Sequence, residues 1–265
     1  MKSKVHSFLY RIFIFLPLLI LLPGASTGQQ QREFYQLFVY HFTTIAQEAT
    51  LDNYFEKALL PALHRQGINK TGVFKSLAND TTTDKLIYIL IPFTKLENIA
   101  GVGSLLAIDK EYQDAANSYT NAIYSDPPYT RKEVMLLQAF SMAPQLQLPA
   151  LKGERKNRVY ELRSYESATE KIFKNKVHMF NEGDEIGLFK RLNFNAVFYS
   201  EVIAGSKIPN LMYMTSFENM EDRNEHWKNF VADPYLKKLS AMPEYQKNVS
   251  RNDITFLYPT DYSDY

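Results

Sequence analysis

Hydrophobic and polar positions follow one pattern twice along this chain, and the second copy begins about 125 residues after the first. Each copy reads as a strand, a helix, two strands, one or more helices and a final strand. The first copy predicts strands over 34–41, 70–77, 85–93 and 133–141. The second copy predicts strands over 159–165, 195–203, 211–217 and 254–258. A repeat this long exceeds a solenoid unit and is typical of a duplicated domain.

The opening strand of the second copy shows the alternation most clearly. Tyr160 and Leu162 lie on one face, and Glu161, Arg163 and Tyr165 lie on the other. A period of two is typical of a strand whose two faces meet different surroundings. The segment that follows has apolar residues at helical spacing, which predicts an amphipathic helix.

The order strand, helix, strand, strand, helix, strand is the ferredoxin-like pattern, an antiparallel sheet with helices on one face. The other face of such a sheet is apolar and must be covered, and two sheets from one chain can cover each other. We therefore predict an α+β fold of two tandem ferredoxin-like domains packed sheet to sheet. Their expected ranges are 33–143 and 158–260, joined by a linker over 144–157 that contains two prolines and a run of charges.

Residues 1–28 have the pattern of an export signal. Lys2, Lys4 and Arg11 precede an apolar run of 11 residues over 12–22, and small residues follow it. A membrane anchor is the alternative, but the run is shorter than the roughly 20 apolar residues that span a bilayer. We therefore expect cleavage, no stable membrane anchor and a periplasmic or secreted location.

Charge and cysteine content narrow the classes of partner. Loss of residues 1–28 would leave 27 basic and 29 acidic residues, a net charge of −2. Such a balance gives no electrostatic attraction for nucleic acid. The chain has no cysteine, so disulfides cannot stabilise it. It also lacks a glycine-rich phosphate loop, a nucleophile elbow and a cysteine nucleophile, which disfavours nucleotide transfer and thiol chemistry. We expect no cofactor.

Four motifs in the second copy resemble the NIPSNAP family, in particular its exported bacterial members. They are YELRSY at 160–165, NAVFYSEV at 195–202, LMYMTSFENMEDR at 211–223, and the pairs His226-Trp227 and Asp233-Pro234. The first copy resembles the same domain more distantly. The resemblance implies a dimeric α/β barrel, here within one chain. Relatives of that architecture include cofactor-independent monooxygenases, lactone isomerases, haem-degrading enzymes and haem peroxidases, so it implies a fold and no single reaction.

Candidate site residues follow from the presumed cavity between the sheets. If the helices cover the face with Tyr160 and Leu162, then Glu161, Arg163 and Tyr165 point into that cavity. The matching positions of the first copy carry no charge, so we expect any pocket nearer the second copy. The alternative is an internal Glu161–Arg163 ion pair that fixes the register of the sheet.

Three further side chains complete the ligand-binding candidates. Tyr199 and Tyr213 lie near the presumed cavity and could receive a flat hydrophobic ligand, although ordinary packing explains them too. His178 lies four residues before Glu182 on a predicted helix, a spacing that suits a metal or a solvated face. Because no third ligand has a matching spacing, we predict no metal site.

Three functions remain open at this point. The first is binding of a small, largely apolar molecule between the two sheets. The second is a cofactor-independent monooxygenase or isomerase, with Glu161 or His178 as base and Arg163 or Tyr165 stabilising an oxyanion. The third is a protein-interaction module. A homo-oligomer is compatible with all three.

Overall fold

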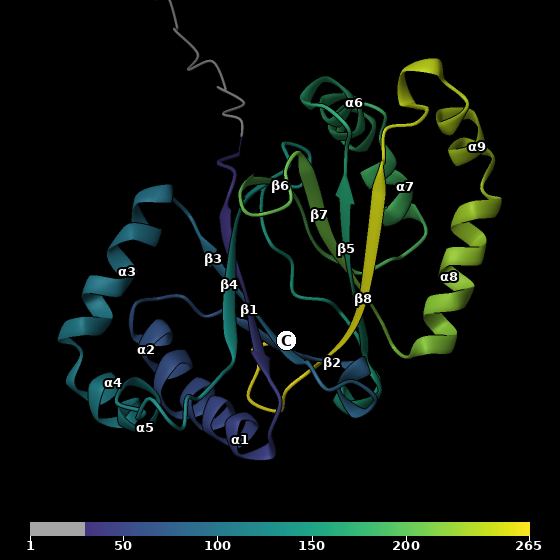
Figure 1. Ribbon diagram of the computed structural model, residues 1–265. Coiled ribbons are helices and arrows are strands. Elements are labelled where there is room, and N and C mark those ends of the chain that lie inside the picture. Colours follow the sequence, from purple (N-terminus) through teal and green to yellow (C-terminus); the bar gives the residue numbers. More distant parts are fainter. Residues whose placement is uncertain (1–29) are drawn as a thin grey trace, which may run out of the picture. The chain divides into compact units, whose positions relative to one another are not determined.

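Eight antiparallel strands form a closed barrel in the order β1-β3-β2-β8-β5-β7-β6-β4 (Figure 1). The strands are β1 (Phe34–Phe42), β2 (Gly72–Ser76), β3 (Lys85–Phe93), β4 (Arg131–Ala139), β5 (Val159–Glu166), β6 (Ala196–Ala204), β7 (Asn210–Phe217) and β8 (Arg251–Pro259). All eight predicted strands are present, with ends within about three residues of expectation. This computed structural model describes residues 30–265, so the export signal expected over 1–28 lies outside the described residues.

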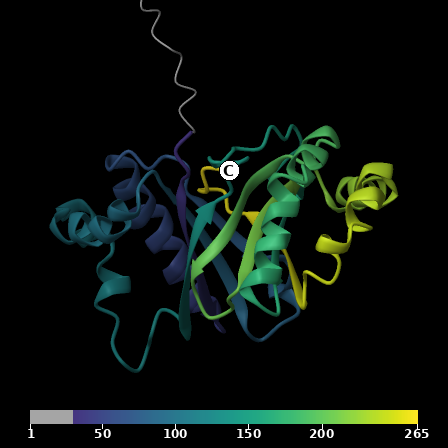
Figure 2. The ribbon, with the colours of Figure 1, turned by 90° about the horizontal axis from the view of Figure 1, so that it is seen from above.

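The helices lie outside the barrel, on two sides of it (Figures 1 and 2). The first half of the chain, with β1–β4, contributes α1 (Ile45–Tyr54), α2 (Leu60–Arg65), α3 (Leu96–Ile108), α4 (Lys110–Ala115) and α5 (Asn117–Thr120). The second half, with β5–β8, contributes α6 (Glu170–Asn181), α7 (Glu185–Arg191), α8 (Met220–Ala232) and α9 (Pro234–Ser240). Between residues 30 and 265, none of the helices combines the length and apolarity that crossing a bilayer requires.

The two halves join along two hydrogen-bonded seams. β2 pairs with β8, and β4 pairs with β6 across a register shift at Leu136 and Leu137. The α+β class and the α/β barrel within one chain are therefore confirmed. The two sets of strands join edge to edge in this barrel, whereas the prediction described two sheets packed face to face. Closure leaves no free strand edge, which an open sheet would have to protect.

Alternate residues of each strand enter different cores. The barrel interior holds a buried apolar cluster from both halves, with Tyr35, Phe74, Tyr160, Leu162 and Met214 among its members. Two further clusters lie between the barrel and the helices of each half.

The expectation that helices cover Tyr160 and Leu162 is wrong, because these residues face the barrel interior. Glu161, Arg163 and Tyr165 face the helices instead. The period of two separates the faces of a strand without saying which face lies inside. The interior of a small barrel is filled by apolar side chains, so the charged face points toward helices that supply polar partners.

The linker and the segment after β8 meet at one end of the barrel. Arg155 donates hydrogen bonds to the main-chain oxygens of Thr260, Asp261 and Ser263 at 3.1, 2.8 and 2.8 Å, and also to that of Tyr265. The ring of Tyr265 lies 5.2 Å from that of Phe74, between ring centroids. One arginine therefore holds the residues that follow β8 against the barrel.

Gly72 gives a first test of the packing at this end. A Cβ at Gly72 would lie 2.3 Å from the ring of Phe74 and 3.0 Å from that of Tyr265. Gly72→Ala should therefore lower the free energy of unfolding by about 1–3 kcal/mol through overpacking, measured by urea denaturation. Gly101→Ala in α3 is the control: nothing lies within 4 Å of its Cβ position, so it should not destabilise the protein. Equal stability of the two variants would contradict this account.

Glu218, just after β7, gives a second test through pH. Its carboxylate accepts hydrogen bonds from the main-chain N–H groups of Lys152 and Gly153 at 2.8 and 2.6 Å, and the bond from Lys152 is the main cause that lowers its pKa below 4.5. A lowered pKa stabilises the fold above the unfolded value and loses that effect as pH falls through the folded value. Glu218→Gln should therefore cost most stability above pH 4.5. In urea titrations, the difference in free energy of unfolding between Glu218→Gln and the unmodified protein should become smaller as the pH is lowered. A difference that does not change with pH would contradict the stabilising role of the Glu218 carboxylate.

Candidate functional site

Glu161 lies at the centre of a buried hydrogen-bond network beneath α8. Its carboxylate accepts from Arg163 Nε at 2.5 Å, Arg223 Nε at 2.7 Å, Arg223 Nη2 at 3.0 Å and Trp227 Nε1 at 2.7 Å. A carboxylate offers about four acceptor positions, so its own protein partners occupy them all. The side chain is also fully buried. Glu161 therefore has no position from which to take a proton from a substrate.

Arg163 extends this network toward the tyrosines. Its guanidinium lies 3.6 Å from the centroid of the Trp227 ring, a cation–π contact. Its Nη1 donates to the Tyr165 hydroxyl at 2.8 Å, and that hydroxyl lies 2.9 Å from the hydroxyl of Tyr213. Burial alone would lower the pKa of Arg163, but the surrounding Tyr213, Tyr165 and Glu161 raise it above its usual range. Of the two alternatives for Glu161 and Arg163, the structure therefore shows the internal ion pair.

Of the remaining candidates, Tyr199 and Tyr213 belong to this network and His178 lies outside it. The ring of Tyr199 stacks on that of Tyr213 with 5.7 Å between centroids. Burial is the main cause that raises the pKa of both phenols well above 10, so both hydroxyls stay protonated at neutral pH. His178 lies apart, where its Nδ1 is 2.7 Å from the hydroxyl of Tyr245. The structure therefore brings five of the six candidates together and leaves His178 out.

Two members of the network were not among the candidates. Arg223 and Trp227 lie four residues apart on α8 and both reach Glu161. The sequence feature that could have identified them is the indole of Trp227, because its N–H needs one hydrogen-bond acceptor wherever it is buried. Its spacing from Arg223 places both side chains on the same face of the helix. Together these features indicate a carboxylate under α8.

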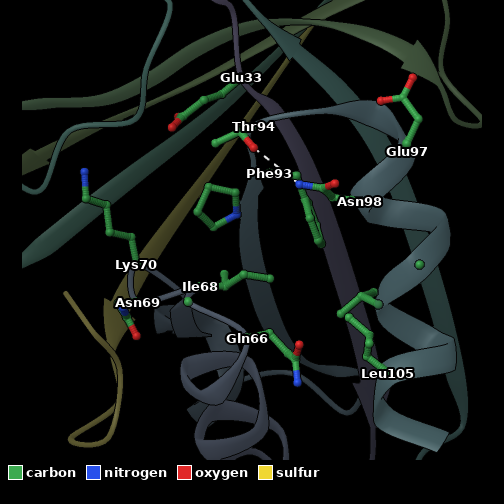
Figure 3. A pocket seen from close by; sticks show the side chains of 14 residues that line it. Glu33, Gln66, Ile68, Asn69, Lys70, Phe93, Thr94, Glu97, Asn98 and Leu105 are labelled. Carbon is green, nitrogen blue, oxygen red and sulfur yellow. Dashed lines mark hydrogen bonds between the residues drawn. The ribbon is translucent and has the colours of Figure 1, made fainter.

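A cleft of about 600 Å³ opens in the first half, between α3, the segment that joins α2 to β2 and the end of β3 (Figure 3). Apolar side chains form its walls: Ile68, Phe93, Val102 and Leu105. Polar side chains line its rim: Glu33, Gln66, Asn69, Lys70, Glu97 and Asn98. Figure 3 shows Ile68 and Leu105 reaching toward each other from opposite sides, with Phe93 behind them.

The cleft exists because α3 docks loosely. None of the residues of α3 is buried, although its sequence LENIAGVGSLLAI carries a single charge. Leu105 and Ile108 are 41% and 80% exposed. Gly101 and Gly103 have no side chain to fill the space, and nothing lies within 4 Å of where either Cβ would be.

Helix α8 holds the matching place in the second half and docks closely. It buries Phe230 and directs Trp227 into the Glu161 network. The expectation that a pocket lies nearer the second half is therefore not met by this cleft. The expectation rested on the charged residues Glu161 and Arg163 of β5. Side chains of α8 pair with Glu161, so this charge does not mark an open pocket.

Residues 160–264 match the family model of NIPSNAP. The second half of the chain therefore matches the NIPSNAP domain, and the resemblance seen in its motifs is confirmed. A NIPSNAP family protein of Agrobacterium tumefaciens is 18% identical, with coverage of 45% of this chain and 98% of its own and a TM-score of 0.37. No curated protein matches the chain.

Two solved structures share the fold over most of the chain. One is a candidate monooxygenase of Lactobacillus acidophilus, 14% identical, with coverage of 86% of this chain and 94% of its own and a TM-score of 0.51. The other is a candidate monooxygenase of Fusobacterium nucleatum, 6% identical, with coverage of 87% and 93% and a TM-score of 0.53. At these identities the likeness shows the barrel fold alone.

We expect Glu161 to stabilise the folded protein. Glu161→Gln places an amide donor against two arginines and leaves buried positive charge uncompensated, which should lower the free energy of unfolding by about 3 kcal/mol. Glu225→Gln, on the exposed face of α8, is the matched control and should change it by less than about 0.5 kcal/mol. Denaturant titration of both variants measures the difference. A Glu161→Gln variant as stable as the control would show that the network is not structural.

Proposed function

We propose that this protein, whose second half matches the NIPSNAP domain, binds a small, largely apolar molecule in the cleft beside α3. The observation that carries the proposal is a hollow of about 600 Å³ with apolar walls and a polar rim. Sites for small molecules typically have volumes of about 300–1,000 Å³ and this distribution of side chains.

The exposed apolar surface of α3 supports the same conclusion. An apolar ligand between Ile68, Phe93 and Leu105 would remove these side chains from water, which is favourable. The cleft lies between secondary-structure elements that the barrel holds, so its β-strand wall is formed before any ligand arrives. The protein needs to order only α3 around the ligand.

The space inside the barrel supports ligand binding less well. Side chains from both halves fill it, with the rings of Tyr35 and Phe198 5.4 Å apart and those of Phe74 and Tyr160 4.9 Å apart. The proposal therefore places the ligand between barrel and helix and not between two sheets.

The arrangement of strands supports an origin from two ferredoxin-like units. Around the barrel the order is β4-β1-β3-β2 and then β8-β5-β7-β6, so each half contributes the same order. In this proposal the second unit keeps a closely docked helix for stability, and the first keeps an open cleft for the ligand. The pattern of residues 1–28 supports export, so we place this binding outside the cytoplasm.

Catalysis is the weaker alternative. The monooxygenase or isomerase hypothesis used Glu161 or His178 as base. Glu161 has its acceptor positions filled by Arg163, Arg223 and Trp227, and His178 is paired with Tyr245, away from the cleft. Binding without turnover is the function that these contacts support best.

Filling the cleft tests the proposal. Leu105→Trp should weaken binding of the uncharged fluorescent probe N-phenyl-1-naphthylamine by tenfold or more, because the indole would occupy the space between Ile68 and Phe93. Leu77→Trp is the control, since Leu77 is similarly exposed at 43% and does not line the cleft. Fluorescence titration gives both dissociation constants. Failure of the unmodified protein to bind the probe, or equal binding by the two variants, would overturn the proposal.

A further inference from the structure

We infer that the ligand of the α3 cleft is an apolar carboxylic acid, whose carboxylate is bound by Lys70. This inference rests on the proposed function and names the chemical class of the ligand. Lys70 lies at the rim, between Gly67 at the end of α2 and the start of β2. Figure 3 shows its side chain extending along the side of the cleft opposite α3.

Lys70 is the lysine that lines this cleft, and it is not one of the described lysines paired with a carboxylate. Within residues 30–265, six lysines lie within 4.0 Å of an acidic side chain: Lys57, Lys75, Lys110, Lys156, Lys176 and Lys207. Lys70 lines a cleft and has no ion pair of this kind with the described residues. A cation beside an apolar cleft is a partner for a ligand anion.

The acidic side chains of the rim are directed elsewhere. Glu33 accepts from the main-chain N–H of Leu146 at 2.7 Å and lies 3.4 Å from the hydroxyl of Tyr35, so it fastens the linker to β1. Glu97 is on the opposite side of the cleft from Lys70, at the start of α3 (Figure 3). Lys70 is therefore the charged group of the rim best placed to meet a ligand.

The amides of the rim fit the same ligand. Gln66 and Asn98 add polar groups on opposite sides of the cleft, and the Asn98 amide donates one hydrogen bond to the hydroxyl of Thr94 at 3.3 Å. Ile68, Phe93 and Leu105 would contact the hydrocarbon part. A molecule with one acidic end and an apolar body matches both kinds of wall.

A pair of ligands that differ only at the polar end tests the inference. Octanoate and 1-octanol share the hydrocarbon chain, and isothermal titration at pH 7.5 gives the affinity of each. The unmodified protein should bind octanoate at least fivefold more tightly than octanol. Lys70→Gln should remove this preference and keep octanol binding. Lys57→Gln, an exposed lysine outside the cleft, should leave the preference intact.

The other outcomes separate the inference from the proposed function. Octanol binding as tight as octanoate, with no effect of Lys70→Gln, overturns the role of Lys70 and leaves the apolar cleft standing. Equal loss of both ligands in Lys70→Gln also overturns it, because the lysine would then shape the cleft without recognising charge. Binding of neither ligand nor the uncharged probe to the unmodified protein overturns the proposed function itself.

Discussion

The two hydrogen-bonded seams between the halves are the constraint on which the rest of this structure depends. Once β2 pairs with β8 and β4 with β6, every strand has one face inside a barrel and one face outside it. The inner space is small and admits mainly apolar side chains, so Tyr160 and Leu162 enter it. The outer face meets helices, and a buried charge such as Glu161 is tolerated there because α8 supplies its donors. Closure of the barrel thus places both the core and the polar network.

The difference between α3 and α8 gives the two halves different properties. α8 carries the large side chains Trp227 and Phe230, which fill the space over β5 and β7. α3 carries Gly101 and Gly103 along with aliphatic residues that stay at least partly exposed. The first arrangement yields a rigid, charge-balanced core, and the second yields a cleft. Two halves with the same order of strands therefore dock their helices differently, α8 closely and α3 with an open cleft beside it.

The sequence predicted the strands and the α+β class of fold well, because period-two alternation and turn residues are local signals. It did not predict which face of β5 lies inside, since alternation is unchanged when the faces are exchanged. Five of the candidate residues, Glu161, Arg163, Tyr165, Tyr199 and Tyr213, lie in one network. The role of this network depends on Arg223 and Trp227, which come from a helix distant in sequence. The cleft arises from missing side chains and loose docking, which no local pattern of residues records.

Pairing of β2 with β8 also governs how the chain can reach its native form. Phe74 meets Pro259 across 185 residues of sequence, so this seam cannot form until nearly all of the described chain has been made. Until then the outer edge of β2 has no neighbour, and an unpaired edge can recruit strands of other molecules. Contacts at such long range are slow to form because a large loop must first close. Assembly of this barrel is therefore a late event, and the interval before it is when the chain is most exposed to misassociation.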